Sequence, residues 1–130
     1  MGEWHFPEHY SEQARSYKRA DRVAAIEVFT RVALPTLRDA ACEHGYALAV
    51  HGSQARDLDL IAVPWTEAAS DAEALIKALC AATAQATGWG HLSNAKSGPE
   101  LKPHGRQAVT ILATSDVHLD LSVMPRRSIR

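Results

Sequence analysis

The sequence predicts a single α/β (α+β) domain in which a small mixed β-sheet packs against helices. Residues 23–40 carry apolar side chains at three- and four-residue steps, which is the pattern of an amphipathic helix. Four shorter apolar runs, bounded by Gly, Pro, Ser and Asp, have the length and composition of strands. A chain of 130 residues can bury one core, so we expect an N-terminal arm and helix start over 1–20 and one domain over 21–130.

The N-terminal region mixes aromatic and polar residues over 1–10, which predicts an irregular arm. From Ser11 the composition becomes helical. The apolar stripe of this helix consists of Val23, Ile26, Phe29, Ala33, Leu37 and Ala40. Pro35 interrupts the stripe and predicts a kink or two abutting helices, and His44-Gly45 is expected to cap the C-terminal end.

Two strands are expected next. Residues 46–51 form a short apolar run that ends at Gly52-Ser53 and predicts a buried strand. Residues 57–63 predict a second strand, which Pro64 closes because proline cannot donate to a sheet ladder.

A second helix should follow, capped by Thr66 or Ser70, because Ser70 and Glu73 have the spacing of a capping box. Gly88 is expected to stop this helix. Its predicted inner face consists of Ala72, Leu75, Ile76, Leu79, Cys80 and Thr83.

The C-terminal part predicts a loop followed by a hairpin. Residues 88–106 are rich in glycine, proline and basic residues, which indicates a long loop or a loop with a short strand. Residues 107–113 and 118–124 are β-rich and flank a short turn, so they predict an antiparallel hairpin that Pro125 ends.

Charge and composition restrict the function. The formal net charge is −1 and the pI is about 6.6, so the chain lacks the basic field that drives non-specific nucleic-acid binding. Any polyanion must be recognised locally, and nucleic acid is not the favoured partner. The start lacks the layout of a signal peptide, and no apolar run reaches the ~20 residues of a membrane span. We therefore expect no membrane partner and a reducing, cytoplasmic compartment, in which Cys42 and Cys80 are free buried thiols rather than a disulfide.

Three aspartates carry the strongest chemical signal. Asp57 and Asp59 alternate on one predicted strand and should project from the same face, while Leu58 and Leu60 take the other face. Asp120 is presented in the same way on the last strand, together with His118 and Ser122. If the two strands are neighbours, the three carboxylates converge on one site, and oxygen ligands of this kind suit Mg²⁺ or Mn²⁺.

The order of these features resembles the nucleotidyltransferase superfamily, which includes DNA polymerase beta, kanamycin nucleotidyltransferase and small antitoxin nucleotidyltransferases. The similar portion covers about residues 23–124. The resemblance implies that Gly52 and Ser53 contact a triphosphate and that Asp57 and Asp59 bind metal. It also implies that Asp120 completes the site and assists deprotonation of the attacking hydroxyl. Small phage-encoded proteins look similar in the Arg-Asp-Leu-Asp-Leu and Lys-Pro-His-Gly-Arg segments.

Local cations and a glycine supply the remaining candidate contacts to a nucleotide. Gly52 lets the backbone approach a phosphate closely, and backbone N–H groups and the Ser53 hydroxyl can bind its oxygens. Metal ions would neutralise charge on the attacking and leaving oxygens of a phosphoryl transfer. The candidate contacts to phosphate or base are Arg56, Lys102, His104 and Arg106.

Three functions remain open at this point. The first is Mg²⁺-dependent transfer of a nucleoside monophosphate from a nucleoside triphosphate to a hydroxyl acceptor. Only three residues separate Ser53 from Asp57, fewer than is usual in that superfamily. The second hypothesis is therefore an inactive protein that binds a nucleotide or cyclic nucleotide, as a phage counter-defence factor would. The third is an antitoxin-like interaction module or homo-oligomer, which the small size and the aromatic arm suggest.

Overall fold

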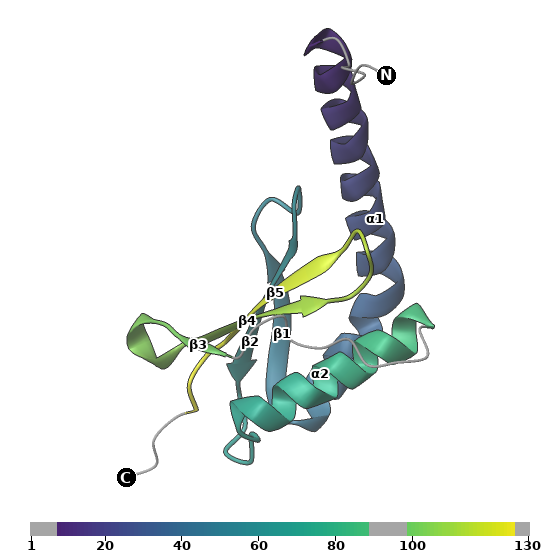
Figure 1. Cartoon of the computed structure of the whole chain (residues 1–130). Coiled ribbons are helices and arrows are strands. Elements are labelled where there is room, and N and C mark those ends of the chain that lie inside the picture. Colours follow the sequence, from purple (N-terminus) through teal and green to yellow (C-terminus); the bar gives the residue numbers. More distant parts are fainter. Residues whose placement is uncertain (1–7, 89–98, 127–130) are drawn as a thin grey trace, which may run out of the picture.

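Two helices pack against one face of a five-stranded mixed sheet (Figure 1). The computed structural model describes residues 8–88 and 99–126, with side chains from residue 18 onward. The α/β (α+β) fold predicted from the sequence is therefore confirmed. No helix in the described ranges combines the length and the apolar character that crossing a membrane requires.

Helix α1 (Glu8–Glu43) is continuous and extends well beyond the sheet at its N-terminal end (Figure 1). It begins three residues before the predicted start, and it runs through Pro35, so the expected division into two helices is wrong. Proline removes one backbone hydrogen bond, but the buried side chains of Leu34 and Leu37 hold this turn against the core. The predicted stripe is buried from Ile26 to Leu37, and Ala40 is partly buried. Val23 is 42% exposed because it precedes the covered part of the helix.

The sheet has the order β1-β2-β5-β4-β3. The central pair, β2 and β5, is parallel, and all other neighbouring pairs are antiparallel. The predicted hairpin is formed by β4 and β5. The strands are β1 (Tyr46–His51), β2 (Leu58–Pro64), β3 (Glu100–Leu101), β4 (Gln107–Leu112) and β5 (His118–Val123). Pro64 pairs with Tyr46 as the last residue of β2, so it belongs to the strand that it was expected to follow.

Helix α2 (Ala72–Thr87) is capped by Asp71 and not by Thr66 or Ser70. The Asp71 carboxylate accepts a hydrogen bond of 2.9 Å from the backbone N–H of Ala74. Ser70 is held differently, because its carbonyl accepts a hydrogen bond of 2.7 Å from the Tyr46 hydroxyl. Aspartate and serine cap helices about equally well, so the tertiary contact of Ser70 decides the first residue of the helix. Gly88 ends the helix in the left-handed conformation, as predicted.

The two faces of the sheet differ in how deeply their side chains are buried. Alternate residues of β2 and β5 are buried against the helices, and the residues between them are only half-buried. The buried set from the sheet comprises Tyr46, Leu48, Leu58, Leu60, Ala62, Val109, Ile111, Leu119, Leu121 and Val123. The opposite face carries polar residues, and both described helices lie on the other side of the sheet (Figure 1). One face therefore forms the core, and the other is available to a ligand.

The cysteines are both free thiols, as expected. Cys80 is buried in α2, and burial raises the pKa of its thiol. Cys42 is exposed near the end of α1, so the expectation that it is buried is wrong.

Candidate functional site

Asp59 and Asp120 lie side by side at the centre of the polar face. They are directly paired across the parallel strands β2 and β5. His51 pairs with Asp59 on the outer side, and Thr110 pairs with Asp120 on the other. The four residues thus form one row across four adjacent strands. The Thr110 hydroxyl donates a hydrogen bond of 3.1 Å to Oδ1 of Asp120, which fixes the orientation of that carboxylate.

Asp57 adds a third carboxylate to this pair. It lies one residue before β2, so its predicted place on the strand is wrong, although it still faces Asp120. Burial raises the pKa of Asp57, and the negative charge of Asp120 and a hydrogen bond with its carboxyl raise it further. The neighbouring His118 acts in the opposite direction, and Asp59 adds a smaller increase. Asp120 therefore neighbours both Asp57 and Asp59, and the convergence of all three aspartates on one metal ion stays a prediction.

The stability of the protein should depend on pH because the pKa of Asp57 is raised in the folded state. Because the pKa of Asp57 is raised in the folded state, ionisation of its carboxyl opposes folding. Its favourable contribution is present below the ordinary value of 3.8 and is lost as the pH rises through the raised pKa. We expect Asp57→Asn to raise the melting temperature at neutral pH. The gain in the free energy of unfolding should be less than about 1 kcal/mol, because solvent screens the repulsion.

The measurement is a series of thermal melts of both proteins from acid to neutral pH. The difference between them should grow with pH. A constant difference, or one that grows toward acid, would contradict the prediction. Asp39→Asn, on the exposed surface of α1, is the matched control for the loss of one aspartate.

A cleft of about 410 Å³ opens beside Asp59 and Asp120. Two cations that the sequence singled out, Lys102 and Arg106, line it. The Arg106 guanidinium donates a hydrogen bond of 2.8 Å to the Ser122 hydroxyl, which holds it over the polar face. Lys102 forms an ion pair of 3.1 Å with Glu100, so part of its charge is already neutralised. Arg106 is therefore the stronger of the two anion-binding groups.

The Gly52-Ser53 turn packs directly against the carboxylate pair. Gly52 has φ +78°, and a Cβ atom at this position would collide with the carboxylate of Asp59. The Ser53 hydroxyl accepts a hydrogen bond of 3.4 Å from the backbone N–H of Ala55. Residues 52–57 contain no helical turn. The glycine thus lets the turn approach the carboxylates, but the serine hydroxyl is engaged within the turn.

Gly52→Ala tests this close approach. We expect it to displace the Asp59 carboxylate and to weaken binding of Mn²⁺ by about tenfold, which is the usual effect of disturbing a metal ligand. Gly88→Ala is a matched control, because Gly88 has φ +75° and no described residue lies within 4 Å of an added Cβ. Both variants carry the same backbone strain, and only Gly52→Ala collides with a site residue. Equal Mn²⁺ affinities in the two variants would contradict the prediction.

The other candidate residues are distributed around this centre. Arg56 lines a second cavity, which it shares with Asp57. His104 lies in the short turn η1 (Pro103–Gly105) and lines none of the cavities described here. Sequence reasoning missed Thr110 as a site residue. The alternation of Val109, Thr110 and Ile111 along the predicted hairpin is the signal that could have placed it beside Asp120.

The donor atoms fit a hard divalent cation. Asp57, Asp59 and Asp120 offer carboxylate oxygens, which Mg²⁺ and Mn²⁺ prefer. Within residues 8–88 and 99–126, no group of three or more His, Cys, Asp or Glu side chains is arranged to hold a metal ion. Mg²⁺ typically binds through one or two carboxylates, with waters and substrate phosphates completing its shell. The described side chains therefore do not form a complete metal site by themselves.

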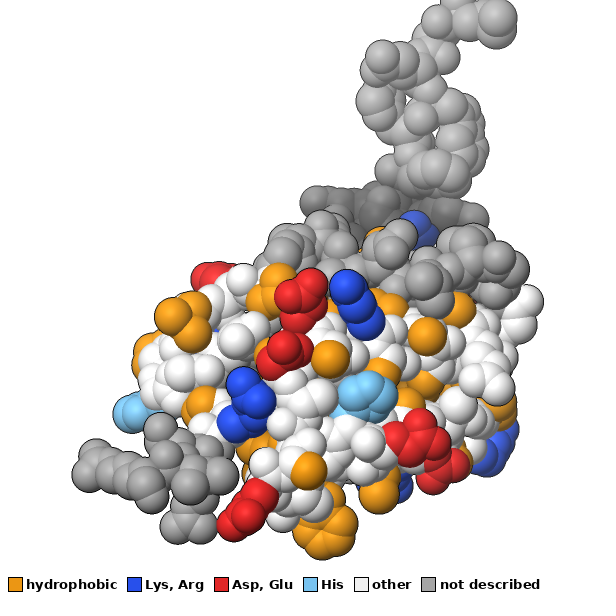
Figure 2. Space-filling view, turned by 90° about the horizontal axis from the view of Figure 1, so that it is seen from below, with side chains coloured by type: hydrophobic (Ala, Val, Ile, Leu, Met, Phe, Trp, Pro, Cys, Tyr) orange, Lys and Arg blue, Asp and Glu red, His pale blue; other side chains and the backbone are white. Residues whose placement is uncertain are grey.

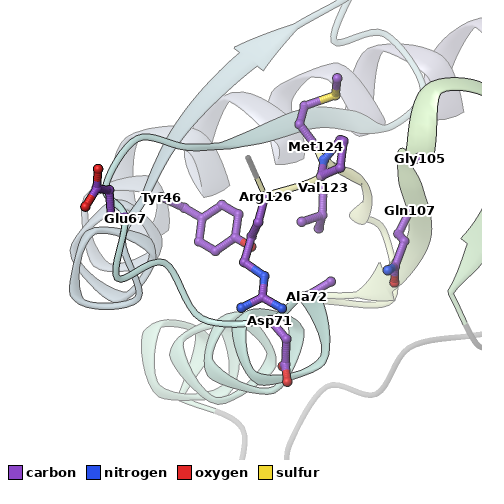
Figure 3. A pocket seen from close by; sticks show the side chains of 10 residues that line it. Tyr46, Glu67, Asp71, Ala72, Gly105, Gln107, Val123, Met124 and Arg126 are labelled. Carbon is purple, nitrogen blue, oxygen red and sulfur yellow. The ribbon is translucent and has the colours of Figure 1, made fainter. Parts of the chain in front are cut away.

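The rest of the described surface offers less to a nucleotide. On the face shown in Figure 2, acidic and basic side chains are interspersed with hydrophobic ones, and no patch of a single sign spreads across it. A cavity of about 540 Å³ lies at the opposite ends of the strands from the carboxylates. Figure 3 shows Arg126 in this cavity beside Tyr46 and Asp71. It contains both signs of charge and none of the site residues predicted from the sequence.

Comparison of the chain with protein-family models, with curated proteins and with solved structures finds no match. The family resemblance of the motifs therefore stays a prediction. The function has to be inferred from the carboxylates and cations themselves.

Proposed function

We propose that this protein is a metal-dependent nucleotidyltransferase that moves a nucleoside monophosphate from a nucleoside triphosphate to a hydroxyl acceptor and releases pyrophosphate. One observation carries the proposal. Asp59 and Asp120 are paired on adjacent strands, with Asp57 against Asp120, on the face of the sheet away from the helices. Carboxylates that crowd together repel one another unless a proton or a cation joins them. A divalent cation with its nucleotide is the natural occupant of such a face.

The roles of the three aspartates follow from their positions. Asp57 and Asp59 would hold Mg²⁺ or Mn²⁺, and the bound metal would neutralise charge on the phosphate oxygens. Asp120 lies between Asp59 and Thr110 in the row, and its Oδ1 atom accepts the Thr110 hydrogen bond. We assign to the Asp120 carboxylate the role of taking the proton of the acceptor hydroxyl, once a bound cation separates it from Asp57. The Thr110 hydroxyl keeps that carboxylate in one orientation.

The cleft beside the carboxylates would hold an anionic part of the substrates. Arg106 projects into it and is fixed by Ser122, so its remaining N–H groups can bind phosphate oxygens. Charge-assisted hydrogen bonds of this kind hold a substrate in position for the reaction.

A second function, nucleotide binding without turnover, is favoured by the geometry of the turn after β1. Residues 52–57 lack a helical turn whose N–H groups could surround a triphosphate. In this alternative the same carboxylates and cations capture a nucleotide or a cyclic nucleotide and catalyse nothing.

One experiment separates the two functions. The protein is incubated with Mg²⁺ or Mn²⁺ and each nucleoside triphosphate, with nucleosides, nucleotides and the protein itself as hydroxyl acceptors. Pyrophosphate release and labelled product are measured, together with nucleotide affinity. We expect metal-dependent release of pyrophosphate with at least one triphosphate. Saturable binding without product would favour the second function, and the absence of both binding and product would exclude both.

A further inference from the structure

A second cavity, of about 390 Å³, lies next to the carboxylates and is lined by side chains from separate parts of the chain. Helix α1 contributes Arg22, and the connection between β1 and β2 contributes Arg56. The turn between β4 and β5 contributes Ser115. The lining is completed by Asp57, Asp116 and His118. The first and last of the three segments are more than ninety residues apart in the sequence, so only the fold brings them together.

Two arginines and two aspartates line this cavity. Asp57 and Asp116 line the same cavity, yet no ion pair joins Arg22 or Arg56 to a described residue. Asp57 faces Asp120 instead. Two guanidinium groups around one cavity can bind a phosphate through several charge-assisted hydrogen bonds, and a serine hydroxyl can add another.

The position of this cavity relative to the carboxylates defines its place in the site. Asp57 lines it, whereas Asp59 and Asp120 line the cleft that contains Arg106. Because Asp57 faces Asp120, the carboxylates lie between the two cavities. The reacting phosphorus of a transfer reaction lies next to the metal, with the leaving group and the acceptor on opposite sides. Each side of the carboxylates therefore has a cavity to which arginine contributes.

We propose that the cavity formed by Arg22, Arg56 and Ser115 binds the polyphosphate of the nucleotide. The proposal rests on the proposed function for its biological meaning, but it concerns a binding site that can be measured without turnover. Arg56 belongs to the same connection as Gly52 and Ser53, so a polyphosphate held here lies along that turn. The cleft with Arg106 then remains for the acceptor.

The test is calorimetric titration of the full-length chain with inorganic tripolyphosphate, without divalent metal. We expect Arg22→Gln to weaken binding about tenfold, the usual effect of losing a hydrogen bond to a charged group. Asp116→Asn should strengthen binding, because it removes a negative charge from the same cavity. Arg31→Gln, at an exposed position of the same helix, is the matched control and should bind as the parent protein does.

Ser115→Ala, in an exposed turn, is a second variant that avoids any disturbance of α1 and should weaken binding several-fold. Absence of tripolyphosphate binding by the parent protein would overturn the proposal, as would equal affinities in the parent, Arg22→Gln and Ser115→Ala. If binding depends on Arg22 but no triphosphate releases pyrophosphate, the polyphosphate cavity stands and the transferase function fails. If pyrophosphate is released but Arg22→Gln leaves the tripolyphosphate affinity unchanged, the transferase function stands and the polyphosphate cavity fails.

Discussion

Asp59→Asn and Asp120→Asn are each expected to lower the rate of metal-dependent pyrophosphate release by at least about a thousandfold, because metal stabilisation of a transition state contributes several kcal/mol. Asparagine keeps the shape of the side chain and removes the charge. Asp59→Asn therefore removes a negative charge that attracts the cation. Asp120→Asn removes the carboxylate that accepts the proton. Steady-state kinetics at saturating Mg²⁺ and at saturating Mn²⁺ provide the measurement.

The two substitutions should differ in their metal dependence. Asp59→Asn should raise the Mn²⁺ concentration needed for half-maximal activity, whereas Asp120→Asn should mainly lower the maximal rate. Asp39→Asn, on an exposed surface of α1, should keep the parent rate. Activity that survives both Asp59→Asn and Asp120→Asn would exclude the metal mechanism. Thermal melts should show that both proteins remain folded, because each substitution relieves repulsion between carboxylates.

Leu119→Ala is expected to cause the largest loss of stability among single substitutions in the sheet. Leu119 is completely buried in β5 and is paired with Leu58, which is also completely buried. Truncation of a buried leucine removes apolar contacts and leaves a cavity, at a cost of about 2–5 kcal/mol. In a domain of this size the melting temperature should fall by on the order of 10 °C. Denaturant titration and thermal melting measure the two quantities.

Leu101→Ala is the matched control for this substitution. Leu101 belongs to the short strand β3 and is 74% exposed, so its truncation should change the free energy of unfolding by less than about 0.5 kcal/mol. A similar loss in both variants would mean that Leu119 does not belong to the core.

The pattern of the strands was readable from the sequence because side chains alternate with a period of two. The alternation of Leu58, Asp59 and Leu60, and of Leu119, Asp120 and Leu121, predicted both the buried and the polar face. It also predicted that the carboxylates would meet if the strands were neighbours. The pairing of Asp59 with Asp120 supplies that neighbour relation, which periodicity alone does not determine.

Two helix predictions failed because tertiary contacts outweigh the preferences of the local sequence. Pro35 did not divide α1, because buried leucines on both sides of it hold the helix to the core. Ser70 did not cap α2, because its carbonyl accepts a hydrogen bond from Tyr46, which lies twenty-four residues earlier. In both cases a contact distant in sequence outweighs a preference of the local sequence.

The cavity lined by Arg22, Arg56 and Ser115 could not be predicted from sequence spacing. Arg22 lies in a helix whose charged residues all look solvent-exposed, and Ser115 lies in a turn that looks purely structural. Their shared cavity with Arg56 depends on where α1 leaves the sheet and on how the hairpin turn reaches it. Only the tertiary arrangement contains this information.

The helices cover only one face of the sheet, and this affects how the protein can evolve. On β2 and β5, residues that hold the core alternate with residues that face the open side. Substitutions at the open positions can alter ligand preference while the buried neighbours keep the fold intact. A new specificity therefore requires few compensating changes in the interior. The same backbone can serve as a scaffold for several ligands.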